Sequence, residues 1–323
     1  VNENQQTICW YVDDNKLSHK DPAVNDEVLD KLTERFGGLD ISRGNEHNFL
    51  GIDFKILEDG KLEIGMVDYI NECIEAFGEK IDGKVSTPAT RHLFDVNEFS
   101  NQLDDDKGDI FHSVVSKLLW VAKRGRPDVD PAITFLCSRV SKSTVDDWMK
   151  LKRVLKFLKQ TINDKRVIGA DNLLELFTWI DASYAVHPDA RSHTGGVMSM
   201  GWGILHYLCG KQKLNTKSST ESEIVGVSDY VPFNVWFRLY MEAQGYFFQK
   251  NVIYQDNQSA IRIEKNGRNS CTGNSRHIHI RYMFTKDRVD KGEFEIEYCP
   301  TESMLADYFT KPLQGSLFNR FRE

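Results

Sequence analysis

Four acidic residues in the second half of the chain occupy positions where carboxylates often serve catalysis. Asp181 and Asp256 follow the apolar runs "LELFTWI" and "NVIY", which are typical of buried strands. Glu223 lies in the first two turns of an expected long helix, and Asp307 lies in an expected final helix. Strand ends in open α/β sheets face the usual ligand crevice, so we expect these side chains to converge.

Converging carboxylates repel one another unless divalent cations neutralise them. The arrangement therefore predicts two-metal hydrolysis of a phosphodiester, in which one ion activates water and the other stabilises the leaving oxygen. Each acid also has a plain alternative. Asp181 fits a turn at a strand end, and Asp256 fits a helix cap. Glu223 and Asp307 fit solvated helix acids near the positive end of the helix dipole. Taken together, the four positions favour the metal site.

A second acidic pair, Asp13 and Asp14, lies in "ICWYVDDNKLSHK" between an apolar and a polar run. Two adjacent aspartates are common in tight turns between strands, so the pair by itself fits a solvated hairpin. The alternative is that both residues are metal ligands.

The composition is that of an ordinary water-soluble chain. Its 323 residues suggest two or three domains, and its net charge of −7 provides no overall basic field for nucleic acid, although local patches do that binding. No apolar run is long enough to cross a bilayer, and no signal peptide is visible, so we expect no membrane partner. The scattered cysteines lack C-x-x-C spacing and predict free thiols in a reducing compartment: Cys9, Cys73, Cys137, Cys209, Cys271 and Cys299.

The first region is predicted to contain a hairpin around Asp13 and Asp14, an amphipathic helix in "NDEVLDKLTERFGG", and a second hairpin turning at Asp59-Gly60. The first helix should end at Gly37-Gly38. Its apolar face comprises Val28, Leu29, Leu32 and Phe36.

The second region, about 80 to 170, is predicted to be helical. Its clearest helix follows Thr144, which resembles a capping box with Asp147. One face of this helix is apolar, with Trp148, Leu151, Leu155 and Leu158. The other face is basic, with Lys152, Arg153, Lys156 and Lys159, and fits either a solvated surface or a phosphate contact.

The third region is predicted to form a mixed sheet. Three antiparallel strands precede a long helix capped by Ser218 or Ser219, followed by a parallel strand, further helices and a fifth strand. The final helix, in "TESMLADYFTK", should be capped by Thr301 or Ser303.

This third region resembles the ribonuclease H domain of copia-type LTR retrotransposons. The matching stretches are "WIDASYA", "SHTGG", "KSSTESEIVG", "YQDNQSAI", "SRHIHIRYMFTKDRV" and "EFEIEYCPTESMLADYFTKPL". The resemblance implies a ribonuclease H-like five-stranded sheet, with Asp181, Glu223, Asp256 and Asp307 as the metal-binding carboxylates. Glu223 is preferred to Glu221 because "EIVGV" matches the family's helix after its catalytic glutamate. The order Asp-Glu-Asp-Asp also differs from that of the related integrases, whose glutamate comes last.

The sequence departs from cellular ribonucleases H in one respect. Those enzymes carry a histidine shortly before the last aspartate, whereas "YCPTESMLAD" contains none. His277 and His279 lie on another expected element, where surface histidines are commoner than metal ligands.

The resemblance extends upstream without a gap. "YVDD" resembles the catalytic hairpin of reverse transcriptases, in which Asp13 and Asp14 would hold Mg²⁺. The following segments resemble the primer-grip hairpin, the thumb and the connection of copia elements. The resemblance implies a multidomain α/β and α+β chain. A partial palm and the start of the thumb would span 1–80, a helical thumb and connection 81–170, and ribonuclease H 171–323.

In that context the basic side chains become predicted contacts to a duplex backbone: Lys123, Arg124, Arg126, Lys152, Arg153, Lys156 and Lys159. A polymerase also needs a third carboxylate and fingers upstream of the aspartate pair, but only twelve residues precede Asp13 and the chain begins with Val1. We therefore expect a piece of a longer Pol polyprotein that does not synthesise DNA alone.

The expected activity is Mg²⁺- or Mn²⁺-dependent cleavage of RNA in RNA–DNA hybrids, with two ions at the ribonuclease H site. The expected partners are the hybrid duplex and the remainder of the polyprotein. The expected location is the cytoplasm, within virus-like particles, or the nucleus with the integration complex. The alternatives are a non-catalytic nucleic-acid-binding remnant and a fragment of an active polymerase.

Overall fold

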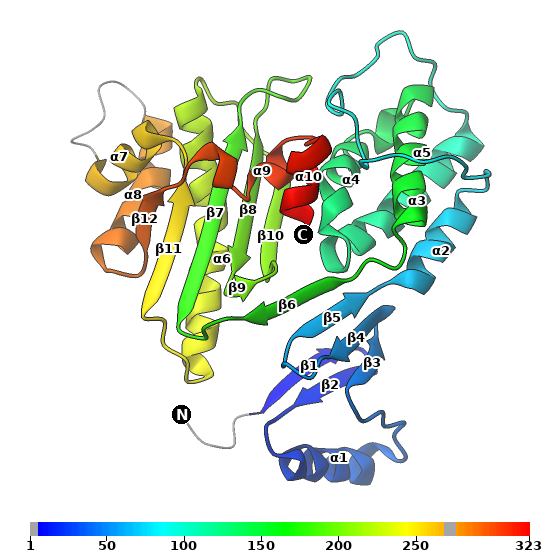
Figure 1. Ribbon diagram of the computed structural model, residues 1–323, viewed down its shortest axis with the longest axis vertical. Helices are drawn as coiled ribbons and strands as arrows, with labels where there is room; N and C mark the ends of the chain where they lie inside the picture. Colours follow the sequence, from blue (N-terminus) through cyan, green and yellow to red (C-terminus); the bar gives the residue numbers. More distant parts are fainter. Residues whose placement is uncertain (1–5, 268–275) are drawn as a thin grey trace.

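A mixed five-stranded sheet forms the C-terminal half of the molecule (Figure 1). The computed structural model describes residues 6–267 and 276–323, and the side chains of residues 276–280 and 282 also lie outside the description. The central strand β7 (Glu175–Ser183) pairs antiparallel with β8 (His193–Ser199), which pairs antiparallel with β10 (His206–Lys211). On its other side β7 is parallel to β11 (Lys250–Gln255), and β11 is parallel to β12 (Glu295–Tyr298). The predicted mixed sheet is confirmed.

Helices cover both faces of this sheet. Helix α6 (Ser219–Ala243) packs against β7 and β8, and α7 (Gln258–Asn266) and α8 (Arg276–Asp290) pack against α6. The short helix α9 (Asp307–Thr310) also packs against β8, and α4 (Asp130–Cys137) packs against β10. Of the two serines predicted to cap α6, Ser218 is the N-cap, and its hydroxyl accepts from the Glu221 N–H.

Two consecutive glycines in β8 let helices approach the sheet from both sides. A Cβ atom on Gly195 would lie 2.6 Å from the backbone oxygen of Ala306, just before α9. A Cβ atom on Gly196 would lie 2.5 Å from the ring of Tyr230 in α6. Successive residues of a strand point to opposite faces, so α9 and α6 lie on opposite faces of the sheet. The motif "SHTGG" therefore encodes close packing on both faces.

A helical region lies beside the sheet, and both share one hydrophobic core. Its core residues come from α2, α3, α4 and α5 and also from the sheet and the C-terminus, including Val197, Tyr207, Phe309 and Phe318. The predicted apolar stripe of α5 is buried in this core. Its other elements are α2 (Val67–Ala76), α3 (Asp105–Arg124), η1 (Pro127–Val129), η2 (Val140–Lys142), α5 (Val145–Gln160) and the C-terminal α10 (Gly315–Arg322).

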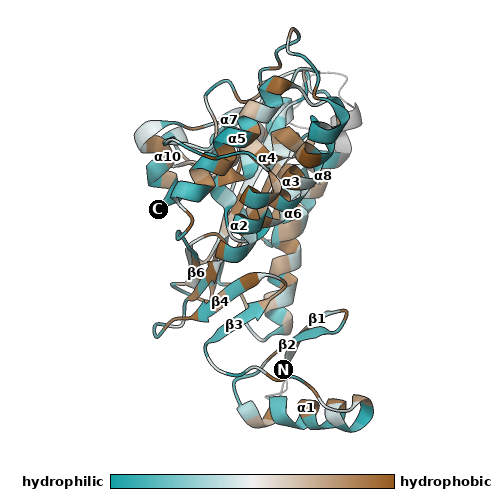
Figure 2. Cartoon of the chain, turned by 90° about the vertical axis from the view of Figure 1, so that its right-hand side faces the viewer, coloured by the Kyte–Doolittle hydropathy of each residue, from teal (hydrophilic) through white to brown (hydrophobic). Residues whose placement is uncertain are grey.

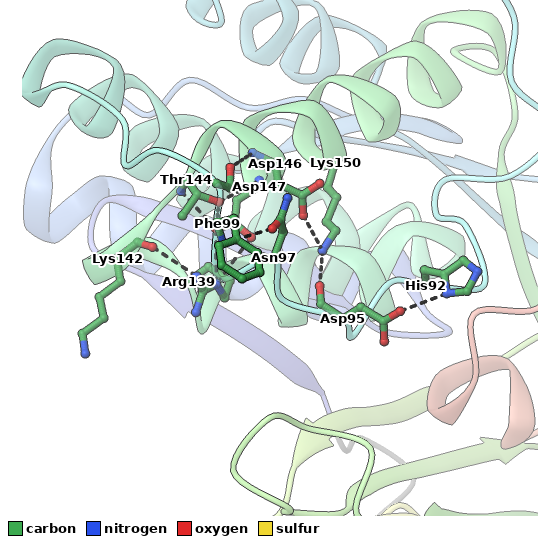
Figure 3. A network of polar contacts seen from close by, with 11 residues as sticks. His92, Asp95, Asn97, Phe99, Arg139, Lys142, Thr144, Asp146, Asp147 and Lys150 are labelled. Atoms are coloured by element: carbon green, nitrogen blue, oxygen red, sulfur yellow. Dashed lines mark hydrogen bonds and ion pairs between the residues drawn. The ribbon is translucent and has the colours of Figure 1, made fainter.

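Helix α5 begins with the predicted capping box (Figure 3). The Thr144 hydroxyl accepts from the Asp147 N–H, and Asp147 Oδ2 accepts from the Thr144 N–H at 3.0 Å. Arg139 Nε donates to the same carboxylate at 3.2 Å, which neutralises a side chain that is almost fully buried. The start of α5 is thus held by a network of charges and caps, and its apolar stripe is directed into the core.

The N-terminal part contains two small sheets. Strands β1 (Thr7–Tyr11) and β2 (Asp14–Ser18) form the predicted hairpin. A second sheet has the order β3–β4–β5–β6–β9, and β6 pairs with both β5 and β9 across the predicted domain boundary near residue 170. Its strands are β3 (Glu46–Phe49), β4 (Ile52–Ile56), β5 (Leu62–Gly65), β6 (Arg166–Ala170) and β9 (Gly201–Trp202).

One helix lies outside the core, and one expectation about a helix is wrong. Helix α1 (Pro22–Phe36) ends at Gly37 as predicted, but it contains no buried residue and lies at one end of the molecule (Figures 1 and 2). Its expected apolar face therefore packs into no core. The predicted final helix is split into η4 (Thr301–Ser303) and α9, and neither Thr301 nor Ser303 is a cap. Within the described residues, no helix has the length and apolar content needed to cross a bilayer.

Substituting Gly195 by alanine should displace α9, because the new methyl group would meet backbone that cannot rotate away. We expect a loss of about 1–3 kcal/mol in the free energy of unfolding, measured by urea denaturation. The control is Gly210→Ala in the adjacent strand, where a Cβ meets nothing within 4 Å. Equal stability of the two variants would contradict this packing argument.

Candidate active site

Three carboxylates meet at the carboxyl ends of the neighbouring strands β7 and β11. Asp181, Glu223 and Asp256 each have an oxygen within 4.8 Å of the others. Asp181 and Glu223 are buried, and Asp256 is half-buried. They form the only group of histidine, cysteine or acidic side chains that meets this geometry among the residues that the structure describes.

The strand register brings two of these acids together. Trp179 of β7 lies opposite Tyr254 of the parallel strand β11, so Asp181 and Asp256, each two residues further on, emerge at the same edge. Asp181 also lies opposite Gly195 in β8, so its side chain points to the face that α9 covers. Glu223 reaches the same edge from α6, on the opposite face. The site is therefore built from both faces of the sheet.

Glu221 and Glu223 have different surroundings. Glu221 Oε2 accepts from the Lys217 N–H at 2.7 Å, next to the N-cap of α6, and has no oxygen in the cluster of three acids. Glu223 Oε2 is buried and has no hydrogen-bond partner. A buried carboxylate oxygen without a donor is costly unless a cation satisfies it. The geometry therefore favours Glu223 as the ligand.

Asp307, the fourth predicted acid, is the first residue of α9 and lies close to Asp181 without joining the cluster of three. Lys311 Nζ lies 2.6 Å from Asp307 Oδ1 and 3.8 Å from Asp181 Oδ2. The Thr310 hydroxyl donates to Asp181 Oδ2. Helix α9 and the residue after it thus bring one acid, one hydroxyl and one ammonium group to the site.

The acids perturb one another in the way expected for an uncompensated cluster. Burial, followed by the charges of Asp181 and Asp256, raises the pKa of Glu223 well above its ordinary value. Burial and Asp181 raise the pKa of Asp256, and the same two causes raise the pKa of Asp307 to about 7. A divalent cation with oxygen ligands would reverse these shifts. Together with the unpartnered Glu223 oxygen, this donor set fits Mg²⁺ or Mn²⁺.

Asp13 and Asp14 differ from these acids in their surroundings. They occupy the exposed turn of the β1–β2 hairpin, where Tyr11 pairs with Asp14. No third acid groups with them within the described part of the chain. The hairpin is thus confirmed, and its role as a metal site stays a prediction.

Most of the predicted basic contacts are used inside the molecule. Lys152 Nζ lies 2.6 Å from Glu79 Oε2, Arg153 donates to the oxygen of Thr87, and Lys159 donates to the oxygen of Ile81. Three basic side chains of α5 therefore contact the chain's own segment 79–87, and their contact with a duplex stays a prediction. The sequence pattern could not reveal this, because the segment that covers the helix is some 70 residues away.

Two further cations are also internal. Arg126 is 4% exposed and donates from two nitrogens to Asp128, at 2.8 and 3.0 Å. Lys123 Nζ lies 2.5 Å from the fully buried Asp130. Burial by itself would raise the pKa of Asp128, but the charges of Arg126 and Arg322 hold that pKa below its ordinary value. Arg126 and Lys123 are therefore paired within the molecule, and their contact with a duplex backbone stays a prediction.

Arg124 and Lys156 remain as predicted contacts to a duplex. Arg124 is exposed, with its guanidinium 4.6 Å from the ring centroid of Trp120. Lys156 is partly exposed. After the larger effect of Lys80, its charge contributes to lowering the pKa of Asp82. The side chains of His277 and His279 lie outside the described residues.

Four residues near the site were not recognised from the sequence as part of it. Thr310 and Lys311 follow Asp307 at helical spacing, which was a signal for contact with it. Thr301 donates to Asp256 Oδ2 at 3.1 Å, so it orients a site acid and does not cap a helix. Glu264 of α7 is fully buried, and neither of its carboxylate oxygens has a hydrogen-bond partner.

The chain is similar to curated transposon proteins over almost its whole length. It is 26% identical over 325 residues to the retrovirus-related Pol polyprotein from transposon TNT 1-94 of Nicotiana tabacum, covering 98% of this chain and 24% of the relative. It is 28% identical to the polyprotein from transposon RE1 of Arabidopsis thaliana, covering 96% of this chain and 21% of the relative. The homologues of the chain are thus retrovirus-related Pol polyproteins, and the chain spans less than a quarter of their length. No family model matches.

A solved structure has a similar fold. The foamy viral protease-reverse transcriptase in complex with RNA/DNA hybrid aligns with 96% of this chain and 37% of its own, at 16% identity and a TM-score of 0.51. At this identity the likeness concerns the fold alone. The predicted mixed α/β fold, with a five-stranded mixed sheet, is confirmed, and the division into domains stays a prediction.

Glu264 should make the stability of the metal-free protein depend on pH. Burial raises the pKa of Glu264 in the folded state well above the ordinary 4.5. At pH values between the unfolded-state pKa and the raised folded-state pKa, the folded state therefore binds more protons than the unfolded state. The free energy of unfolding should therefore fall as pH rises above about 4.5. Glu264→Gln removes this term and should be more stable than the wild type by roughly 1–3 kcal/mol at pH 8, but not at pH 4.

Urea unfolding in EDTA at both pH values measures the effect. Glu295→Gln, at an exposed glutamate of β12, is the control and should change little. A Glu264→Gln variant that is less stable than the wild type at pH 8 would contradict the assignment of a buried, unpaired carboxyl group.

Proposed function

We propose that this chain is the ribonuclease H-bearing part of a transposon Pol polyprotein. Its activity would be endonucleolytic cleavage of the RNA strand of RNA–DNA hybrids, leaving 3′-hydroxyl and 5′-phosphate ends. The observation that carries the proposal is the convergence of Asp181, Glu223 and Asp256 within 4.8 Å at the carboxyl edge of two parallel strands. The relatives and the fold support the same assignment.

The proposed cofactors are two Mg²⁺ or Mn²⁺ ions, held by Asp181, Glu223 and Asp256 with Asp307 as the further acid. Bound divalent cations would supply activation of water and stabilisation of charge on the leaving oxygen. The chain's own contribution is to orient the ligands. Thr310 holds Asp181, and Thr301 holds Asp256, each through a hydroxyl donor. Glu223 is itself buried, so its carboxylate is shielded from bulk water.

The proposed substrate is a hybrid duplex recognised by shape, backbone charge and 2′-hydroxyl groups, and not by base sequence. Support comes from the neighbour of similar fold, whose structure is a complex with RNA/DNA hybrid. Arg124 and Lys156 are the candidates for backbone contact on the helical region. The remainder of a Pol polyprotein is the proposed protein partner, and cytoplasmic virus-like particles or the nucleus are the proposed location.

RNA-directed DNA synthesis is a separate proposal that concerns a longer chain. It would require Asp13 and Asp14 to meet a third carboxylate, which the described residues do not place beside them. We propose it only for a polypeptide in which that acid is present.

Incubation with a labelled RNA–DNA hybrid and Mg²⁺ tests the ribonuclease proposal. The wild type should cleave the RNA strand, and Glu223→Gln and Asp256→Asn should each lower the rate on the order of 100-fold or more, the scale of losing one preorganised electrostatic contact. Glu221→Gln is the matched control two residues away and should keep cleavage, because its carboxylate binds the Lys217 N–H outside the cluster.

The proposal fails if the wild type binds the hybrid without cleaving it, which would instead favour a non-catalytic binding remnant. It also fails if Asp256→Asn cleaves as fast as the wild type. A filter-binding measurement on the same variants separates loss of cleavage from loss of binding.

A further inference from the structure

One cation of the chain lies among the site acids. The Lys311 ammonium is 2.6 Å from Asp307 Oδ1 and 3.8 Å from Asp181 Oδ2, and its charge also lowers the pKa of Asp256 against the raising effect of burial. The Asp181 and Asp307 side chains are only 4–5% exposed, whereas that of Lys311 is 39% exposed. A lysine thus reaches from the surface to two buried carboxylates.

The backbone of Lys311 is held in place. Its N–H donates to the Asp307 oxygen at 3.0 Å, and its own oxygen accepts from the Leu313 N–H at 2.8 Å. The residue ends α9 in an extended conformation, as the following Pro312 requires. The ammonium is therefore delivered to the site by a fixed turn and not by a freely moving segment.

An exposed lysine four residues after an aspartate would ordinarily contribute little, because water and salt screen the pair. Here both acids are buried, and screening is correspondingly weaker. Asp307 also has no oxygen in the cluster formed by Asp181, Glu223 and Asp256. Its carboxylate contacts the Lys311 ammonium and lies beside Asp181, so the lysine is a countercharge to both acids.

We propose that Lys311 is a positioning residue that holds Asp307 against Asp181 in the metal-free chain and competes with the second divalent cation for these two carboxylates. The proposal rests on the proposed two-ion function of the site. It implies that the first ion binds more tightly than the second, and that the second ion binds only as the ammonium is displaced from Asp307.

Lys311→Gln keeps a side chain of similar reach but removes the charge. Without the ammonium, the metal-free acids repel one another, so the midpoint of thermal unfolding in EDTA should fall. The second ion then no longer competes with the Lys311 ammonium for Asp307 and Asp181. Its dissociation constant should therefore fall about tenfold, as expected from removing one nearby like charge. Mn²⁺ titration followed by electron paramagnetic resonance counts the bound ions and gives both dissociation constants.

Two controls accompany this variant. Lys311→Arg keeps the positive charge and should restore both the unfolding midpoint in EDTA and the weak second ion. Lys291→Gln removes a lysine whose partner is the exposed Asp287 and should leave the dissociation constants unchanged. A purely structural role for Lys311 would lower stability without tightening the second ion.

The proposal is overturned if Lys311→Gln leaves the second dissociation constant unchanged or weakens it, or if the wild type binds fewer than two ions. These readouts do not require turnover. A wild type that binds two ions with the predicted Lys311 effect, yet leaves the hybrid uncut, would overturn the proposed ribonuclease function and not the role of Lys311.

Discussion

Mutual repulsion among buried carboxylates is the constraint on which the rest of this structure depends. Asp181, Glu223 and Asp256 lie within 4.8 Å of one another, and Asp307 adds a fourth charge beside them. Such a group is stable only if cations, hydroxyl donors or protons compensate it. The chain supplies Thr310, Thr301 and Lys311 for this purpose, which leaves one buried oxygen of Glu223 without a partner. This uncompensated oxygen is one that a bound cation could satisfy.

The sheet must also accept helices on both faces at the same level, because the acids come from both sides. Gly195 and Gly196 make this possible, since a side chain at either position would collide with α9 or α6. The core then continues from the sheet into the helical region, with Tyr207 and Phe309 stacked at 4.5 Å. The site is thus supported by residues from the whole C-terminal half and by helices as early as α2.

Much of the fold followed from local patterns. The capping box at Thr144, the cap at Ser218, the Asp59-Gly60 hairpin and the five strands of the mixed sheet were all predicted, because turn chemistry and hydrophobic periodicity are local properties. Two features do not follow from local patterns. Helix α1 has an apolar face but no buried residue. On the basic face of α5, Lys152, Arg153 and Lys159 contact segment 79–87 of the same chain.

By itself, the sequence indicated the four candidate acids and most of the elements that carry them, because strand ends and helix starts can be recognised from neighbouring residues. Only the tertiary structure showed that Glu221 and Glu223, two residues apart on α6, have different surroundings: Glu221 accepts from the Lys217 N–H, whereas Glu223 lies beside Asp181 and Asp256. It alone revealed that Lys311 faces Asp181, 130 positions earlier in the chain. It also decided which basic residues remain exposed, because a charge is free or paired according to contacts that sequence spacing does not contain.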